Sequence, residues 1–369
     1  MKISVPSEIA ARELRVAITP DIVGRLIKQQ KIDVVIQSGA GLRAGFRDDA
    51  YAAAGATVVQ GAATLYRDAT LIAKVQPPTP EEIAMIPEGA TVISLMRPGQ
   101  SADVVESMTQ RKLTSLALEL VPRITRAQSM DVLSSQSTVS GYKGVLIGAA
   151  ALPKFLPMLT TAAGNISPAK CFVIGAGVAG LQAIATARRL GAVVSGFDVR
   201  PAAREQVLSL GATFVQSDVV SDTAQTAGGY AREQTEEEKA RTLEAMANHI
   251  KDMDLVITTA AIPGRPAPKL ITAAMVETMR AGSVIVDLAA ETGGNCALSK
   301  PGETVVEHDV TIIAPLNVPS TVPFHASQMF SRNVFELCKE LVKEDALQLD
   351  STAEIVGAMM MTHNGQVLR

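Results

Sequence analysis

The sequence predicts an α/β protein with two doubly wound parallel sheets, and three observations indicate this fold class. Short apolar runs rich in β-branched residues alternate with helical patterns along most of the chain, which is typical of parallel sheets. A second series of such runs begins near Lys170, after the first series has ended. The length of 369 residues is sufficient for two buried cores. We therefore expect two Rossmann-like domains with a cofactor cleft between them.

The first series consists of expected strands separated by helices. The strands are expected at 3–5, 34–37, 57–59, 71–75, 91–95 and 114–118, with helices among them at 20–29 and 102–111. The second series has expected strands at 171–174, 193–197, 255–258, 283–287 and 311–313. A helical pattern at 326–342 and short strands around an Asn364-Gly365 turn signal follow. This last helix is expected to return to the first domain, which gives domains of 1–125 with 325–369 and of 126–324.

Residues 171–200 carry the most informative motif in the chain. An apolar run leads into Gly175-Ala-Gly177-Val-Ala-Gly180, a helical pattern follows, and a second apolar run ends in Asp198. The first glycine permits a tight turn, the second lets a pyrophosphate approach the backbone, and the third lets helix and strand pack closely. The helix N-terminus offers N–H groups to phosphates. Together these features predict a dinucleotide-binding site, and the alternative is a similar unit that has lost its ligand.

The acid at the end of the second run indicates which dinucleotide is bound. Asp198 lies where a carboxylate accepts both hydroxyls of the adenosine ribose and repels a 2′-phosphate, which favours NAD(H) over NADP(H). Arg200 stands two residues later and is long enough to reach a 2′-phosphate. We expect Asp198 to dominate.

Two polar loops are candidates for function. The stretch 121–137 is dense in hydrogen-bonding side chains, and the alternative is an interdomain hinge whose polar groups bond each other and cap the next helix. The stretch 217–234 is long and contains Gly228, Gly229 and Tyr230, which is typical of a mobile lid or of a plain surface loop.

Composition excludes several classes of function. The net charge of −3, with scattered basic residues and no tryptophan, argues against a nucleic-acid partner. The three cysteines are far apart and make no metal-binding pattern. The apolar region 144–164 is interrupted by Pro153, Lys154 and Pro157, so we expect no membrane helix there. The chain opens directly into a strand-like run, so no signal peptide is expected.

Motifs spread over the whole chain resemble the alanine dehydrogenase/transhydrogenase family, and within it the NAD(H)-binding component (first domain of the alpha subunit) of proton-translocating NAD(P) transhydrogenases. The motif pair Arg126-Ala-Gln-Ser129 and Gly228-Gly-Tyr-Ala231 is the most specific part of this resemblance. Other matching stretches are Arg15-Val-Ala-Ile-Thr-Pro20, Ser38-Gly-Ala-Gly41, Lys74-Val75, Pro122-Arg123-Ile124, Gly141-Tyr142-Lys143, Thr161-Ala-Ala-Gly164, Ile262-Pro-Gly264, Val286-Asp-Leu-Ala289 and Gly293-Gly-Asn295.

The resemblance implies a set of site residues. The implied catalytic group is a polar loop around the nicotinamide and its ribose, formed by Gln128, Arg123, Asp131 and the nearby Ser134. The implied cofactor contacts are Arg123, Ile124, Thr125, Arg126, Gln128, Gly175, Gly177, Val178, Gly180, Asp198, Val199, Arg200, Gly229, Tyr230 and Ala261, with no metal. Gly229 and Tyr230 would belong to a closing loop. Ala261 stands where the family often has leucine, which implies a weaker apolar contact near the adenine.

The resemblance also implies an activity and its partners. Hydride would pass between NADH on this chain and NADP+ on a partner component, coupled to proton translocation by a membrane-spanning subunit. Because only one convincing dinucleotide fingerprint is present, NADP(H) is expected on that separate component. The chain would form a homodimer and lie peripherally at the cytoplasmic face of the inner membrane, touching the membrane only through its partners.

An alanine dehydrogenase is the alternative function. Arg15 and Lys74 match positions at which that enzyme holds pyruvate, but the run after 91–95 has Met96 where its catalytic histidine is expected. All four histidines lie far away in the sequence, and the acid expected within 286–294 is Glu291 or is absent. Oxidation of an amino acid requires proton transfer, whereas direct transfer between two nicotinamides requires only position, orientation and exclusion of water. The loop of Arg, Gln, Asp and Ser residues fits the second chemistry.

Overall fold

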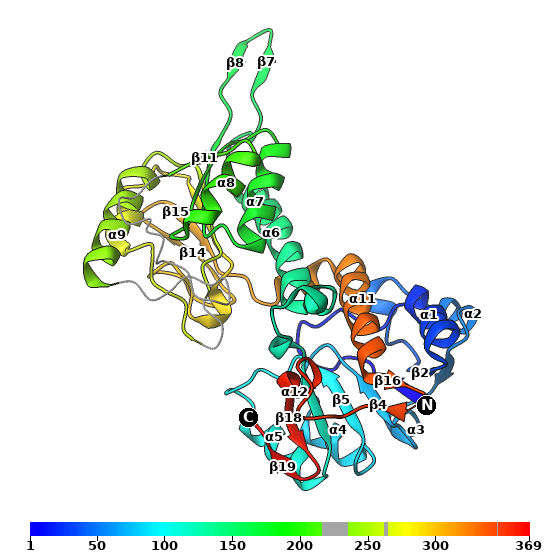
Figure 1. Cartoon of the computed structure of the whole chain (residues 1–369). Coiled ribbons are helices and arrows are strands. Elements are labelled where there is room, and N and C mark those ends of the chain that lie inside the picture. Colours follow the sequence, from blue (N-terminus) through cyan, green and yellow to red (C-terminus); the bar gives the residue numbers. More distant parts are fainter. Residues whose placement is uncertain (216–234, 262–264, 345) are drawn as a thin grey trace. The chain divides into compact units, whose positions relative to one another are not determined.

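The protein is described from a computed structural model, which covers residues 1–215, 235–261, 265–344 and 346–369. The chain divides into two compact units, Met1–Gln136 with Pro319–Arg369, and Ser137–Val318. Each unit is built on its own mixed sheet with helices packed against it (Figure 1). The predicted α/β class with two largely parallel sheets is therefore confirmed. The domain limits at 125/126 and 324/325 stay a proposal.

The first unit contains an eight-stranded sheet in the order β19-β18-β6-β5-β4-β1-β2-β3. Its strands are β1 (Lys2–Val5), β2 (Asp33–Gln37), β3 (Thr57–Val59), β4 (Leu71–Ala73), β5 (Thr91–Ser94), β6 (Thr114–Ala117), β18 (Met360–His363) and β19 (Gln366–Val367). The strands β1 to β6 are parallel, and β18 and β19 extend the sheet in antiparallel pairing. The β18–β19 turn uses Asn364 and Gly365, both at positive φ, as the turn signal predicted.

Helices cover both faces of this sheet, because alternate strand residues belong to two different core clusters. Leu71 and Ala73 join one cluster, and Ile72 between them joins the other. The helices are α1 (Pro20–Gln30), α2 (Asp48–Ala53), α3 (Ala62–Tyr66), α4 (Pro80–Met85), α5 (Ala102–Gln110), α11 (Pro323–Leu341) and α12 (Val356–Met359), with 3-10 turns η1 (Leu42–Ala44), η2 (Leu118–Leu120) and η3 (Thr125–Met130). The short strands β16 (Val342–Lys343) and β17 (Ala346–Leu347) form a separate ladder. The turn η5 (Val318–Thr321) precedes α11.

The second unit contains a seven-stranded sheet in the order β11-β10-β9-β12-β13-β15-β14. Its strands are β9 (Lys170–Ile174), β10 (Val193–Phe197), β11 (Thr213–Phe214), β12 (Leu255–Thr258), β13 (Val284–Asp287), β14 (Thr304–Glu307) and β15 (Val310–Ile313), and β14 alone is antiparallel among these described strands. Its helical elements are α7 (Val178–Arg189), α8 (Pro201–Ser209), α9 (Glu236–Ile250), α10 (Ala273–Glu277) and η4 (Ala290–Thr292). Phe172 and Val173 on β9 point into different core clusters, so this sheet is also buried on both faces.

Three elements differ from the sequence-based expectation. The apolar region 144–164 contains the end of a long helix, α6 (Val132–Ala151), and the start of a hairpin, β7 (Leu159–Thr161) and β8 (Gly164–Ile166), which projects from the second unit (Figure 1). The antiparallel strand β14 was not expected. The helix at 326–342 begins earlier, at Pro323, because proline is favoured in the first turn of a helix.

Candidate functional site

A glycine turn joins β9 to α7 in the second unit. Gly175 has a φ of 92°, which a residue with a β-carbon rarely adopts, and Gly177 is the N-cap of α7. A β-carbon on Gly180 would overlap the carbonyl oxygen of Gly175, so close packing of helix on strand requires glycine there. A β-carbon on Gly177 would meet nothing closer than the guanidinium of Arg200, at 3.9 Å. The side of Gly177 is therefore open to a ligand, and Val178 beside it is 43% exposed.

The glycine turn lies at the point where the sheet reverses its strand order. The strand β9 has β10 on one side and β12 on the other, and ligands of such sheets bind at the carboxyl ends of these strands. Thr259, directly after β12, donates from its hydroxyl to the carbonyl oxygens of Gly175 at 3.0 Å and Ile174 at 3.3 Å. The turn is thus held from the neighbouring strand.

Asn295 and Asp287 hold the loop after β12 in place, and sequence reasoning did not identify either as a site residue. Buried Asn295 accepts from Ala260 N at 3.1 Å and donates to Ala260 O at 2.8 Å. The buried carboxylate of Asp287 accepts from Asn295 N, at 3.1 Å. Ala261, the predicted adenine contact, is the exposed continuation of this loop. The only sequence signal was the Gly293-Gly-Asn295 motif, which carries no indication of its spatial partner.

Asp198 follows β10 and its carboxylate lies against the glycine turn. It accepts from Ala176 N at 2.8 Å and from Arg200 N at 2.9 Å. The guanidinium of Arg200 adds two further bonds, Nε to Oδ1 at 2.9 Å and Nη2 to Oδ2 at 2.8 Å. These bonds raise the pKa of Arg200. The sequence placed both residues near the adenosine end but did not predict that they pair with each other. Val199 between them is half-buried and packs on an adjacent core cluster.

The predicted nicotinamide loop lies in the first unit, around the 3-10 turn η3. Ala127 and Met130 of this turn are buried in the core of the unit. Gln128 between them is exposed. The other predicted contacts of the loop share this surface position, except for Ile124, which is half-buried against the core: Arg123, Thr125 and Arg126. Arg126 also pairs with Glu354, Nη2 to Oε2, at 3.0 Å.

Asp131 and Ser134 bond each other at the start of α6. The carboxylate of Asp131 accepts from Ser134 N at 2.9 Å and from Ser134 Oγ at 2.6 Å, which satisfies backbone at the helix N-terminus. Asn333 on α11 fixes the same junction, because it donates to Ser129 O at 2.7 Å and accepts from Ser135 Oγ at 2.7 Å. The capping role considered from the sequence is thus present for Asp131 and Ser134, while Gln128 takes no part in this cap.

The predicted site residues fall into separate parts of the described structure. Arg123 to Ser134 belong to the first unit, and the glycine turn, Asp198 to Arg200 and Ala261 belong to the second. Gly229 and Tyr230, predicted for a closing loop, lie outside the described residues. The cofactor cleft between the two domains stays a prediction.

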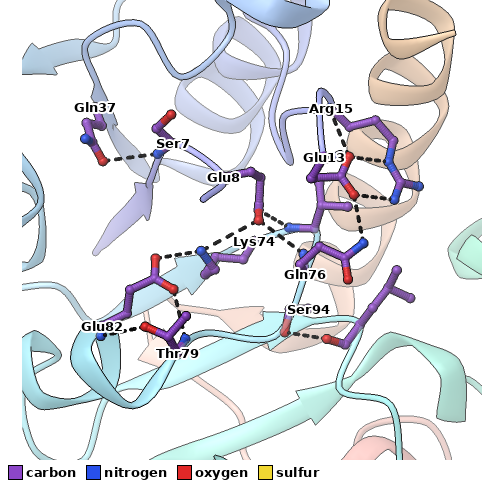
Figure 2. A network of polar contacts seen from close by, with 12 residues as sticks. Ser7, Glu8, Glu13, Arg15, Gln37, Lys74, Gln76, Thr79, Glu82 and Ser94 are labelled. Atoms are coloured by element: carbon purple, nitrogen blue, oxygen red, sulfur yellow. Dashed lines mark hydrogen bonds and ion pairs between the residues drawn. The ribbon is translucent and has the colours of Figure 1, made fainter. Parts of the chain in front are cut away.

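A buried ionic network lies at the corresponding point of the first unit, where β1 and β4 diverge in strand order (Figure 2). Lys74, just after β4, bonds Glu82 at 2.7 Å and lies 3.7 Å from Glu8. Arg15 bonds Glu13 through Nε at 2.8 Å and Nη2 at 2.7 Å. Both cations that match pyruvate-holding positions of alanine dehydrogenase therefore have carboxylates of this chain as partners.

Further contacts complete this network. Gln76 donates to Glu13 Oε2 at 2.7 Å, and Arg97 donates to Gln76 at 2.7 Å. Burial alone would raise the pKa of Glu13, but its bonds with Arg15 and Gln76 lower it to about 2. Burial raises the pKa of Glu8, against the opposing charge of Lys74. Met96, at the position of the dehydrogenase histidine, has a side chain without a titratable group, and its N–H bonds Glu119.

The described residues contain neither a metal cluster nor a membrane span. Over 1–215, 235–261, 265–344 and 346–369, no three His, Cys, Asp or Glu residues are grouped to hold a metal ion. Within the same ranges no helix combines the length and the hydropathy needed to cross a membrane.

Comparison with known proteins identifies the family. The family model for the alanine dehydrogenase/PNT N-terminal domain matches residues 4–140, and that for the C-terminal domain matches residues 144–369. The chain belongs to the alanine dehydrogenase/PNT family. The first of the separate parts of the NAD(P) transhydrogenase alpha subunit of Rhodospirillum rubrum is 46% identical, over 100% of this chain and 98% of that protein. Alanine dehydrogenase of Halomonas elongata is 30% identical, over 100% and 94%.

Solved structures agree with this ranking of the two family branches. The transhydrogenase of Sinorhizobium meliloti has a TM-score of 0.88 at 42% identity, covering 100% of this chain and 99% of that one. An L-alanine dehydrogenase has a TM-score of 0.84 at 26% identity, covering 100% and 97%. The prediction of a transhydrogenase alpha-subunit component is confirmed over the full length of the chain.

Proposed function

We propose that this chain binds NAD(H) and exchanges a hydride with NADP(H) held by a partner component, coupled to proton translocation by a membrane-spanning subunit. The observation that carries the NAD(H) assignment is the glycine turn at the strand-order reversal of the second unit, with Asp198 against it. The open side of Gly177 and the N-terminus of α7 fit a pyrophosphate. Asp198 fits the adenosine ribose.

The exposed loop of the first unit is the proposed nicotinamide contact. NAD(H) supplies the carbon that donates or accepts hydride, so the protein needs to supply position, orientation and a dry site. Gln128 has an amide donor and an acceptor suited to the ribose or carboxamide. Arg123 adds positive charge, and Asp131 with Ser134 fixes the start of α6 behind the loop. We propose the same contacts for Ile124, Thr125 and Arg126.

The partners follow from the proposed reaction. Relatives of this length are named as the first of several parts of an alpha subunit, which supports further components that bind NADP(H) and span the membrane. We propose that the chain forms a homodimer and docks peripherally on these components at the cytoplasmic face of the inner membrane.

Reconstitution tests this function directly. The pure chain, mixed with an NADP(H)-binding partner component, is expected to transfer hydride between NADH and an NADP+ analogue, because the partner supplies the second nicotinamide. The transfer is followed by the absorbance change of the analogue, with each component alone as the control. Calorimetric titration that detects NADPH binding but no NADH binding to this chain would contradict the proposal.

Alanine dehydrogenase is the second candidate, because a solved enzyme of that kind shares the fold over the full chain. We expect no NADH formation from L-alanine and NAD+ at alkaline pH. Met96 supplies no proton acceptor, and Lys74 and Arg15 are held by the carboxylates of the network. The measurement is NADH absorbance with an authentic alanine dehydrogenase as the positive control, and steady NADH production by the pure chain would favour the second candidate.

A further inference from the structure

We propose that the guanidinium of Arg200 is an internal competitor for the ribose site on Asp198, which NAD(H) must displace in order to bind. This inference rests on the proposed NAD(H) function and deepens it. It makes Arg200 a residue that sets cofactor affinity and selectivity through the carboxylate it covers.

The argument begins with the acceptor sites of Asp198. An ionised carboxylate has about four lone-pair sites, two on each oxygen. Oδ1 accepts from Arg200 N and Arg200 Nε, both at 2.9 Å. Oδ2 accepts from Ala176 N and Arg200 Nη2, both at 2.8 Å. All four sites are therefore filled in this structure, and none is left for a hydroxyl.

The four bonds differ in how easily they are given up. Two come from backbone N–H groups at the ends of β9 and β10, which the sheet fixes. The other two come from the side chain of Arg200, which is 21% exposed and able to rotate outward, whereas Asp198 is 7% exposed. Release of the guanidinium frees one site on each oxygen. A ribose diol offers two hydroxyl donors, which is the number of sites freed.

The position of Arg200 supports competition with the cofactor rather than a distant structural role. Its Nη2 lies 3.9 Å from where a β-carbon of Gly177 would be, so the guanidinium stands at the open side of the glycine turn. A pyrophosphate approaching that turn meets the same group. The guanidinium thus occupies space and hydrogen-bond sites that the cofactor needs.

The ion pair also affects selectivity. While Arg200 covers Asp198, the pair is close to neutral and repels a 2′-phosphate weakly. A released guanidinium is a good partner for that phosphate. Arg200 therefore lowers affinity for NADH and narrows the difference between NADH and NADPH.

The test compares Arg200→Met with the parent by calorimetric titration of NADH and NADPH. We expect Arg200→Met to bind NADH roughly tenfold more tightly, a gain of about 1.4 kcal/mol, because no ion pair is broken on binding. NADPH should bind more weakly than to the parent, because Asp198 is then uncompensated. Arg189→Met is the matched control, since Arg189 is exposed in the last turn of α7, and it should leave both affinities unchanged.

Two further measurements keep the inference decidable. In an Asp198→Asn background, Arg200→Met should give no gain in NADH affinity. In the parent, the Arg200 Nε–H resonance should shift and exchange faster with water when NADH saturates the protein, a readout that does not depend on the variant folding. An Arg200→Met protein that binds NADH no more tightly than the parent, or an Arg200 resonance unchanged by NADH, overturns the inference. A parent that binds no NADH instead refutes the proposed function.

Discussion

Replacing Gln128 by asparagine is expected to slow hydride transfer in the reconstituted complex about a hundredfold, while NADH affinity changes less than tenfold. Asparagine keeps the amide but shortens its reach by one methylene, so the ring is misplaced rather than released. Gln128 is exposed on a turn whose neighbours Ala127 and Met130 are buried, so the change should not disturb the core. Because two nicotinamides must meet at a fixed angle, a small misplacement affects the rate more than the binding.

Stopped-flow single turnovers at saturating NADH separate the rate from the affinity. Ser129→Ala is the matched control, because Ser129 is the next exposed side chain and its backbone carbonyl, not its hydroxyl, bonds Asn333. Transfer at the parental rate by the saturated Gln128→Asn protein would contradict the proposed role and leave only the hinge and cap interpretation of this loop.

Gly177→Ala and Gly180→Ala are expected to fail in different ways. The methyl group of Gly177→Ala has room in the free protein, so the fold should keep its melting temperature, but the methyl blocks pyrophosphate approach and should weaken NADH binding by roughly a hundredfold or more. The methyl group of Gly180→Ala overlaps the backbone at Gly175, so α7 must move away from β9. We expect that variant to lose several kcal/mol of unfolding free energy, as in severe overpacking.

Thermal unfolding and NADH titration of both variants make the measurement, with the parent as the control. Equal melting temperatures for the two variants would contradict the packing role of Gly180. Parental NADH affinity in Gly177→Ala would show that no pyrophosphate lies at the turn.

Local sequence patterns were sufficient to predict most of the sheet. The strands β1 to β6 and β9 to β13 have apolar residues on both faces, and such runs are readable without knowing their partners. The hairpin β7–β8 is exposed along most of its length, so no core periodicity marks it. The antiparallel strand β14 pairs only at the sheet edge and alternates exposed with half-buried residues, a weaker signal than a buried run.

The candidate site divides in the same way. The glycine turn and Asp198 form a motif within one stretch of chain, which the sequence displays directly. The contacts of Asn295 with Ala260 and of Lys74 with Glu8 join residues far apart in sequence, and spacing gives no indication of them. The pairing of Arg200 with Asp198 is local, but it depends on side-chain rotamers that a sequence pattern does not specify.

The ionic network of the first unit has a consequence for how its N-terminal segment is held. Residues 6–19 form neither helix nor strand, yet they lie fixed between β1 and α1. The carboxylate of Glu8 accepts from Val75 N at 2.5 Å, and the Glu13–Arg15 pair is buried. Buried charges thus anchor this stretch where elsewhere a ladder of backbone bonds would.

An anchor of this kind responds to protons more than to salt, because buried pairs are poorly screened. The pKa of Glu13 is lowered to about 2 in the folded chain, so its stabilisation is fully present above the ordinary carboxyl pKa and is lost as the pH falls toward 2. The raised pKa of Glu8 acts in the opposite sense, since the cost of its burial as a charge is relieved in acid. The segment is therefore tied to the sheet by two carboxylates with opposing acid responses, which makes its attachment less sensitive to mild acid than either carboxylate alone would be.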